Sequence, residues 1–294
     1  MVDIAPRLAR IAPSEQSFFG YLFWVSRPRF WLYLAGPVIV GVVYAANSPA
    51  EFFTPIAVLL FAYFLLPANV FLYGINDIFD ADIDRFNPKK SDAGREVRYT
   101  KNRTVVAAVC LAALLAVGFV PFLPMSGSVA LAGFLLVGAA YSAPPARLKT
   151  VPLLDSVSNG LYILPGVVAY AAISGELPPT LAVAAGWLWA MGMHTFSAIP
   201  DIQPDRRAGI RTTATVLGTP RTLGYCAGCW GVAAALMGAV HPAFVPVFVG
   251  YPVFIGAIVA FDIDISRAYW WFPVINTVAG TAVTMMGVWV VLYG

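Results

Sequence analysis

The sequence predicts an all-α, polytopic membrane protein with nine transmembrane helices. Of its 294 residues, 60% are hydrophobic and only 11% are charged, whereas a soluble domain carries about 25% charged residues. The apolar residues fall in runs long enough to cross a hydrocarbon core of roughly 30 Å. Lysines and arginines gather in alternate loops, which is typical of proteins that obey the positive-inside rule.

The apolar runs give the positions of the spans, and the fourth run is short because Pro144 and Pro145 end it. We expect spans at 30–47, 54–75, 104–123, 128–143, 153–173, 180–199, 222–240, 243–261 and 271–293. The first run begins only near Phe30, behind four arginines, so we expect no cleaved targeting segment. We therefore predict a single transmembrane domain, 1–294, in which 1–29 form a cytoplasmic N-terminal segment.

The basic residues predict the orientation in the membrane. With the N-terminus inside, all 18 lysines and arginines fall in the inner segments and the outer loops hold none. Such an asymmetry predicts a multi-pass protein of the plasma membrane with the same loops facing the cytoplasm. The outer loops keep only Glu51, Glu176 and His241 as ionisable groups.

Two aspartate clusters follow spans on this inner side. The first reads N-D-x-x-D-x-x-x-D and consists of Asn76, Asp77, Asp80 and Asp84. If the second span continues as a helix, spacings of three and four residues bring these side chains onto one face. The second cluster has D-x-x-x-D spacing directly after the sixth span. It consists of Asp201 and Asp205.

Carboxylates placed so close together repel one another, so a cation is expected between them. Oxygen ligands without histidine favour Mg²⁺, which commonly binds one or two carboxylates together with substrate phosphates. We predict metal ligation by Asn76, Asp77, Asp80, Asp84, Asp201 and Asp205, and catalytic roles for the four aspartates Asp80, Asp84, Asp201 and Asp205. The alternative is that both clusters are ordinary solvated loops.

Further polar residues near the same side are candidates for substrate binding, because basic groups beside acidic ones suit a metal-bound diphosphate. They are Asn76, Arg27, Tyr141, Arg147, Lys149, Arg206, His194 and Asn159. The basic residues have an alternative role as membrane anchors. Asn159 and Asp155 either line the pocket or bond neighbouring helices. For His194, the alternative to substrate binding is an interhelical hydrogen bond. The aromatic residues either belt the interfaces or line an apolar tunnel.

Together these stretches resemble the UbiA superfamily of intramembrane prenyltransferases. The resemblance rests on 76–84, 201–205 and the loop from Tyr141 to Lys149. It implies nine helices around a central cavity with a cytoplasmic cap, and two Mg²⁺ ions that bridge a diphosphate. It also implies a prenyl diphosphate donor, a lipophilic acceptor within the lipid bilayer, and no nucleic acid.

Within the superfamily, residues 194–215 and 154–160 resemble lycopene elongases, which build C50 carotenoids. This resemblance implies transfer of a prenyl group, dimethylallyl, to a carotenoid such as lycopene. Two alternatives stay open. One is a related prenyltransferase that acts on an aromatic or quinone precursor, and the other is a membrane transporter, which would place polar or broken-helix sites near the bilayer midplane.

Overall fold

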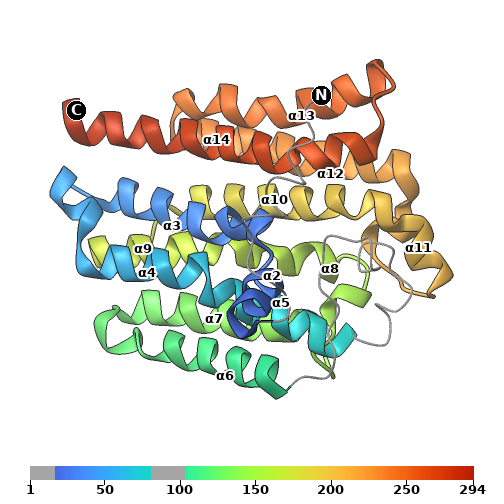
Figure 1. Cartoon of the computed structure of the whole chain (residues 1–294). Coiled ribbons are helices and arrows are strands. Elements are labelled where there is room, and N and C mark those ends of the chain that lie inside the picture. Colours follow the sequence, from blue (N-terminus) through green and yellow to red (C-terminus); the bar gives the residue numbers. More distant parts are fainter. Residues whose placement is uncertain (1–16, 81–102) are drawn as a thin grey trace.

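The computed structural model describes residues 17–80 and 103–294, and all regular structure in these two ranges is helical. The helices lie side by side as a bundle (Figure 1). In chain order they are α2 (Phe18–Val25), η1 (Pro28–Phe30), α3 (Trp31–Ala45), η2 (Pro49–Phe53), α4 (Pro55–Leu65), α5 (Pro67–Asp80), α6 (Arg103–Val117), η5 (Val120–Phe122), α7 (Met125–Ser142), η6 (Leu148–Thr150), α8 (Leu154–Val157), η7 (Ser158–Ile163), α9 (Leu164–Ser174), α10 (Thr180–Ser197), η8 (Ile199–Asp201), α11 (Ile202–Arg207), α12 (Thr213–Val240), η9 (Pro242–Phe244), α13 (Val245–Ala260) and α14 (Ile265–Tyr293).

The predicted all-α, polytopic fold is confirmed. Within the described ranges, eight helical stretches are long and apolar enough to cross a membrane, and they coincide with eight of the predicted spans. The remaining predicted span, 180–199, is α10, which carries His194 and other polar residues that lower its mean hydropathy. It packs between α12 and η7, inside the bundle. The sequence did not indicate α2, because eight residues are too few for a span.

Two hydrophobic cores hold the bundle together. The first is built from α3 to α7 and α9 around Phe64 and Phe134. The second is built mainly from α10, α12, α13 and α14, and its centre is aromatic: the rings of Phe196 and Phe272 are 5.0 Å apart and those of Trp230 and Phe272 are 5.7 Å apart. Each such ring pair contributes about 0.5–1.5 kcal/mol beyond its buried area.

Small residues allow close helix crossings within the first half. A Cβ atom added to Gly41 of α3 would lie 2.2 Å from the carbonyl oxygen of Gly166 in α9, so the two backbones touch there. Glycine at such crossings is characteristic of membrane helices. On the outside, large apolar side chains such as Leu114, Leu136 and Val278 are exposed, as expected for a surface that faces lipid.

Two of the predicted spans are interrupted, and α12 is kinked just before the predicted start of the seventh span. Pro67 separates α4 from α5, and the side-chain amide of Asn69 donates to the carbonyl oxygens of Phe64 (2.9 Å) and Leu65 (3.0 Å) at the break. The fifth span consists of α8, η7 and α9, and α12 is kinked at Gly218, which has a φ of 71°. Irregular backbone at membrane depth is tolerated where it is buried in protein or lines a cavity, and η7 lines the cavity described next.

Candidate active site

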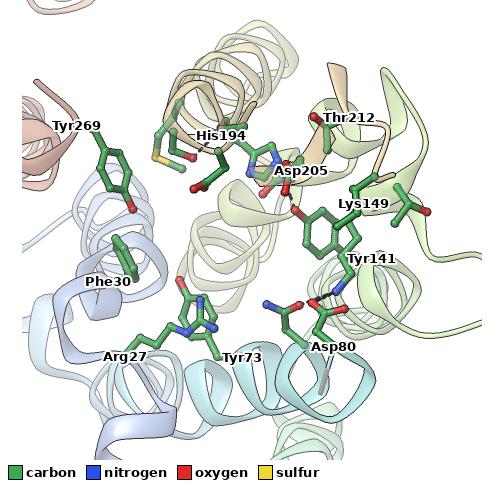
Figure 2. Close-up of a pocket in the computed structure, with 18 of the residues that line it drawn as sticks. Arg27, Phe30, Tyr73, Asp80, Tyr141, Lys149, His194, Asp205, Thr212 and Tyr269 are labelled. Atoms are coloured by element: carbon green, nitrogen blue, oxygen red, sulfur yellow. Dashed lines mark hydrogen bonds and ion pairs between the residues drawn. The ribbon is translucent and has the colours of Figure 1, made fainter. Parts of the chain in front are cut away.

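A cavity of about 340 Å³ lies between the two cores, at the end of the bundle where α5, α7 and α10 finish. Figure 1 shows α11, α8 and the end of α5 gathered at this end, away from the C-terminus. One part of the cavity lining is charged and another part is aromatic (Figure 2). The charged part consists of Arg27, Asp80, Lys149, Asp201 and Asp205, and the aromatic part consists of Phe30, Tyr33, Tyr73, Tyr162, Tyr269 and Phe272.

The last turn of α5 forms the first corner of the site. Asp80 is ion-paired with the Lys149 ammonium and with Arg147, whose Nη2 lies 3.1 Å from Asp80 Oδ1. The same ammonium donates to Asn76 Oδ1 at 2.6 Å and to Ser142 Oγ at 3.3 Å. The Lys149 ammonium is therefore held by oxygen atoms of three side chains, and Figure 2 shows Lys149 reaching down to Asp80. The same oxygen atoms suit a bound positive charge.

Two arginines approach α5 from strained backbone positions. Arg27 and Arg147 have φ values of 51° and 40°, and each precedes a short 3₁₀ helix, η1 and η6 respectively. Such a conformation costs a non-glycine residue on the order of 1–3 kcal/mol. Arg27 Nη2 donates to Asp77 Oδ1 at 3.0 Å, and its guanidinium carbon lies 4.6 Å from the centre of the Tyr73 ring. The strain thus accompanies arginines that are aimed at the first aspartate cluster.

The second aspartate cluster follows α10. Asp201 in η8 and Asp205 in α11 both line the cavity, and Figure 2 shows Asp205 beside His194, with Tyr141 between it and Asp80. Arg206 faces away from this lining, because its Nε and Nη2 donate to the carbonyl oxygen of Thr215 at 3.1 and 2.6 Å. It therefore holds α11 against the first turn of α12.

The buried carboxylate of Asp155 joins α8 to the start of α12. Asp155 of α8 is only 1% exposed. It accepts hydrogen bonds from the backbone N–H of Thr213, at 2.9 Å, and from the Thr213 hydroxyl. The backbone N–H of Leu153 donates to the same hydroxyl at 2.8 Å. Of the two roles considered for Asp155, the structure shows the bond to a neighbouring helix.

The aromatic wall has its own hydrogen bonds. The hydroxyl oxygens of Tyr73 and Tyr162 are 3.4 Å apart, and the Tyr33 hydroxyl accepts from the side-chain amide of Asn276 at 3.2 Å. Phe30 stacks on Tyr33 with 5.5 Å between ring centres. Aromatic rings therefore form most of this side of the cavity, with the Arg27 guanidinium over the Tyr73 ring.

Most of the residues predicted for the site line this one cavity. They are Arg27, Asn76, Asp80, Tyr141, Lys149, Asn159, His194, Asp201 and Asp205. Arg147 and Asp77 lie beside the lining, through their contacts with Asp80 and Arg27, and Arg206 bonds Thr215. Asp84 lies outside the described residues.

Sequence reasoning missed three aromatic residues of the lining, Tyr33, Tyr269 and Phe272. They belong to the first and last long helices, and nothing in their local sequence separates them from interfacial or lipid-facing aromatics. Their only signal is that both segments carry aromatic residues near the same end of the bundle.

The donors fit a metal that is shared with a ligand rather than one enclosed by protein. In the parts of the chain that the structure describes, no three Asp, Glu, His or Cys side chains are grouped closely enough to hold a metal ion. Instead, Asn76 and Asp80 face the cavity from α5, and Asp201 and Asp205 face it from η8 and α11. Oxygen donors on separate walls suit Mg²⁺ that also binds substrate phosphates.

The UbiA prenyltransferase family model matches residues 34–270 of this sequence. The chain belongs to the UbiA prenyltransferase family. The family and the enzyme class predicted from the aspartate clusters are thereby confirmed, and the transporter alternative is set aside. The match covers both aspartate clusters and the loop from Tyr141 to Lys149.

Individual relatives extend this similarity over the whole chain. The chain is 56% identical to the lycopene elongase/hydratase of Haloarcula japonica over 98% of both chains. It is 57% identical to the lycopene elongase/hydratase of Haloferax volcanii, over 93% of this chain and 90% of that relative. Among solved structures, a UbiA homologue from Archaeoglobus fulgidus bound to DMAPP and Mg²⁺ has a TM-score of 0.68 at 20% identity, covering 90% of this chain and 99% of that one. This likeness shows a shared fold.

Proposed function

We propose that this prenyltransferase carries out Mg²⁺-dependent transfer of a dimethylallyl group from its diphosphate to the terminal double bond of a linear carotenoid such as lycopene. It works in the plasma membrane, with the mouth of the cavity and the N-terminal segment on the cytoplasmic side. The observation that carries the proposal is one cavity in which acidic and basic side chains adjoin an aromatic wall. The names of the haloarchaeal relatives support the choice of acceptor.

Each part of the charged lining has a distinct task. Asn76, Asp80, Asp201 and Asp205 would hold Mg²⁺, and Asp77 and Asp84 are the further ligands predicted from the sequence of the first cluster. Bound Mg²⁺ supplies positive charge that stabilises the leaving diphosphate. Lys149 and Arg27 bind phosphate oxygens, since both line the cavity and cationic donors form strong bonds with phosphate. Arg147 orients Asp80 through its 3.1 Å ion pair.

The aromatic wall controls what happens to the allylic group. When the bond between C1 and oxygen breaks, its electron pair leaves with the diphosphate and C1 becomes cationic. Ring faces attract cations, and the wall of Phe30, Tyr33, Tyr73 and Tyr162 keeps water from that side of C1. The π electrons of the acceptor then form the new carbon–carbon bond to C1.

The test uses membranes that contain the wild-type protein, Asp80→Asn or Asp201→Asn, supplied with dimethylallyl diphosphate, lycopene and Mg²⁺. Mass spectrometry should find a longer carotenoid with the wild type. Each variant should lose roughly a hundredfold or more in turnover, the cost of removing one group that stabilises developing charge. Chelation with EDTA should stop turnover and added Mg²⁺ should restore it.

A matched control is Asp264→Asn. Asp264 caps α14 by accepting from the backbone N–H of Arg267 at 2.7 Å, and it is not part of the cavity lining. Asparagine caps helices equally well, so turnover should be unchanged. Retained activity in both the Asp80 and Asp201 variants would refute the metal assignment, and a product formed only from an aromatic acid or quinone precursor would refute the carotenoid acceptor.

A further inference from the structure

Tyr141 and His194 form a hydrogen-bonded pair inside the cavity. The Tyr141 hydroxyl and His194 Nε2 are 3.3 Å apart, and the two rings meet edge to face with an angle of 87° between their planes. The residues come from α7 and α10, on opposite sides of the boundary between the two cores, and both line the cavity. Figure 2 shows Tyr141 between Asp80 and Asp205, and His194 beside Asp205.

In the proposed function the diphosphate lies between the cavity walls that carry Asp80 and Asp205, and Tyr141 and His194 line the same cavity. The proposed function therefore places C1 of the donor beside the pair. When a terminal trisubstituted double bond attacks C1, the new cationic carbon of the acceptor is only two bonds from C1. The pair can therefore reach that carbon, whereas Tyr73 and Tyr162 bond each other across the aromatic wall.

We propose that Tyr141 and His194 hold the water molecule that quenches this acceptor cation, and that they take its proton. The proposal rests on the proposed function and assigns it a hydrated product. The oxygen of water forms a bond to the cationic carbon, and one O–H bond of that water breaks. Its proton passes to the Tyr141 oxygen while Tyr141 gives its own proton to His194 Nε2, and the imidazolium then protonates the departing diphosphate. No oxidant or reductant is needed.

The surroundings favour this pair as the water site. A water molecule occupies about 30 Å³, so it fits in a cavity of about 340 Å³ next to a five-carbon group. A hydroxyl and an imidazole offer both a donor and an acceptor; on the aromatic side, the hydroxyls of Tyr73 and Tyr162 face each other and that of Tyr33 accepts from Asn276. The competing outcome is loss of a proton from the carbon next to the cation, with the diphosphate as base, which gives an alkene.

The experiment compares the wild type with His194→Gln and Tyr141→Phe in membranes supplied with dimethylallyl diphosphate and lycopene in heavy-oxygen water. The measured quantity is the ratio of hydrated to alkene product, with total prenylated product recorded separately. The wild type should give a hydrated product that carries the heavy oxygen. Both variants should lower the ratio by about tenfold, the effect of losing one hydrogen bond to the water.

The control for loss of a tyrosine hydroxyl is Tyr63→Phe. Tyr63 is buried in the first core, and its hydroxyl is without a hydrogen-bond partner in the described structure, so the product ratio should stay at the wild-type value. An unchanged ratio in both test variants, with only total product reduced, would mean a structural role and would overturn the proposal. A wild-type product that is entirely alkene would also overturn it. A wild type that prenylates no carotenoid would instead refute the proposed function itself.

Discussion

Variants of the ion pair between Arg27 and Asp77 can distinguish its contribution to stability from the contribution of Arg27 to catalysis. The pair is well buried: 15% of the Arg27 side chain and 4% of the Asp77 side chain are exposed. We predict that Arg27→Met lowers both the free energy of unfolding and turnover, whereas the double variant Arg27→Met with Asp77→Asn regains stability without regaining turnover.

The magnitude follows from the contacts of the guanidinium. Removing one partner of a buried ion pair costs roughly 3–5 kcal/mol, because a charge is left in a poorly solvated place. The 4.6 Å contact with the Tyr73 ring adds about 0.5–1 kcal/mol. Since 15% of the arginine side chain is exposed, we expect the lower end, about 3 kcal/mol. Neutralising Asp77 as well removes the remaining buried charge and should recover about 2 kcal/mol of that loss.

The assay is unfolding of the purified protein in micelles by increasing SDS, run together with turnover of the same samples. Turnover should stay low in the double variant, because Arg27 lines the cavity and is proposed to bind the diphosphate. The reasoning would be refuted if Arg27→Met unfolds like the wild type, or if the double variant is as unstable as the single one. Recovery of turnover in the double variant would remove Arg27 from the diphosphate site.

Three further predictions concern buried contacts. Asp155→Ala should lower the unfolding free energy by about 1–3 kcal/mol in the SDS assay, because Thr213 loses its acceptor. Gly160→Ala should cost about 1–3 kcal/mol and shift the tryptophan fluorescence, because its Cβ would lie 1.8 Å from Cε2 of Trp187. Asn69→Ala should also cost about 1–3 kcal/mol, since the break before α5 loses two hydrogen bonds.

Each of these predictions has a matched control. Asp155→Asn keeps one acceptor for Thr213 and should be less harmful than alanine. Gly228→Ala adds a Cβ with nothing within 4 Å and should leave stability unchanged or slightly raised. Asn47→Ala, at an exposed position, is the control for Asn69. A test variant that unfolds like its control would contradict the contact assigned to it.

The fold could be predicted from the sequence because hydropathy and loop charge, which are local properties, specify membrane helices. The breaks within the helices could be predicted only in part. Pro67 is visible as a helix breaker inside a predicted span, but the bonds from Asn69 that compensate for it depend on how the chain folds back. The predicted seventh span likewise begins at 222, whereas α12 begins at Thr213, capped by Thr212, and continues across a kink at Gly218.

The site was predictable to the extent that it depends on helical spacing. Asp80, Asp201 and Asp205 share a cavity because both clusters lie where helices end on the same side of the bundle. The hydrogen-bond partners of the basic residues were not predictable. Arg206 looks like a phosphate ligand in sequence, yet it donates to the carbonyl oxygen of Thr215. Which basic group turns inward depends on tertiary contacts that no local pattern encodes. The single-domain assignment for 1–294 stays a prediction.

The hydrogen bonds of the tyrosine wall bear on how long such an enzyme survives its own chemistry. An allylic cation alkylates any electron-rich oxygen that it reaches, including a phenol. The hydroxyls of Tyr73 and Tyr162 face each other at 3.4 Å, and that of Tyr33 is engaged by Asn276. For the proposed reaction, these hydrogen bonds engage one lone pair of Tyr33 and one of the Tyr73–Tyr162 pair, which leaves fewer lone pairs on the wall for the cation to attack. The same contacts that shape the wall therefore make alkylation at its oxygens less favourable.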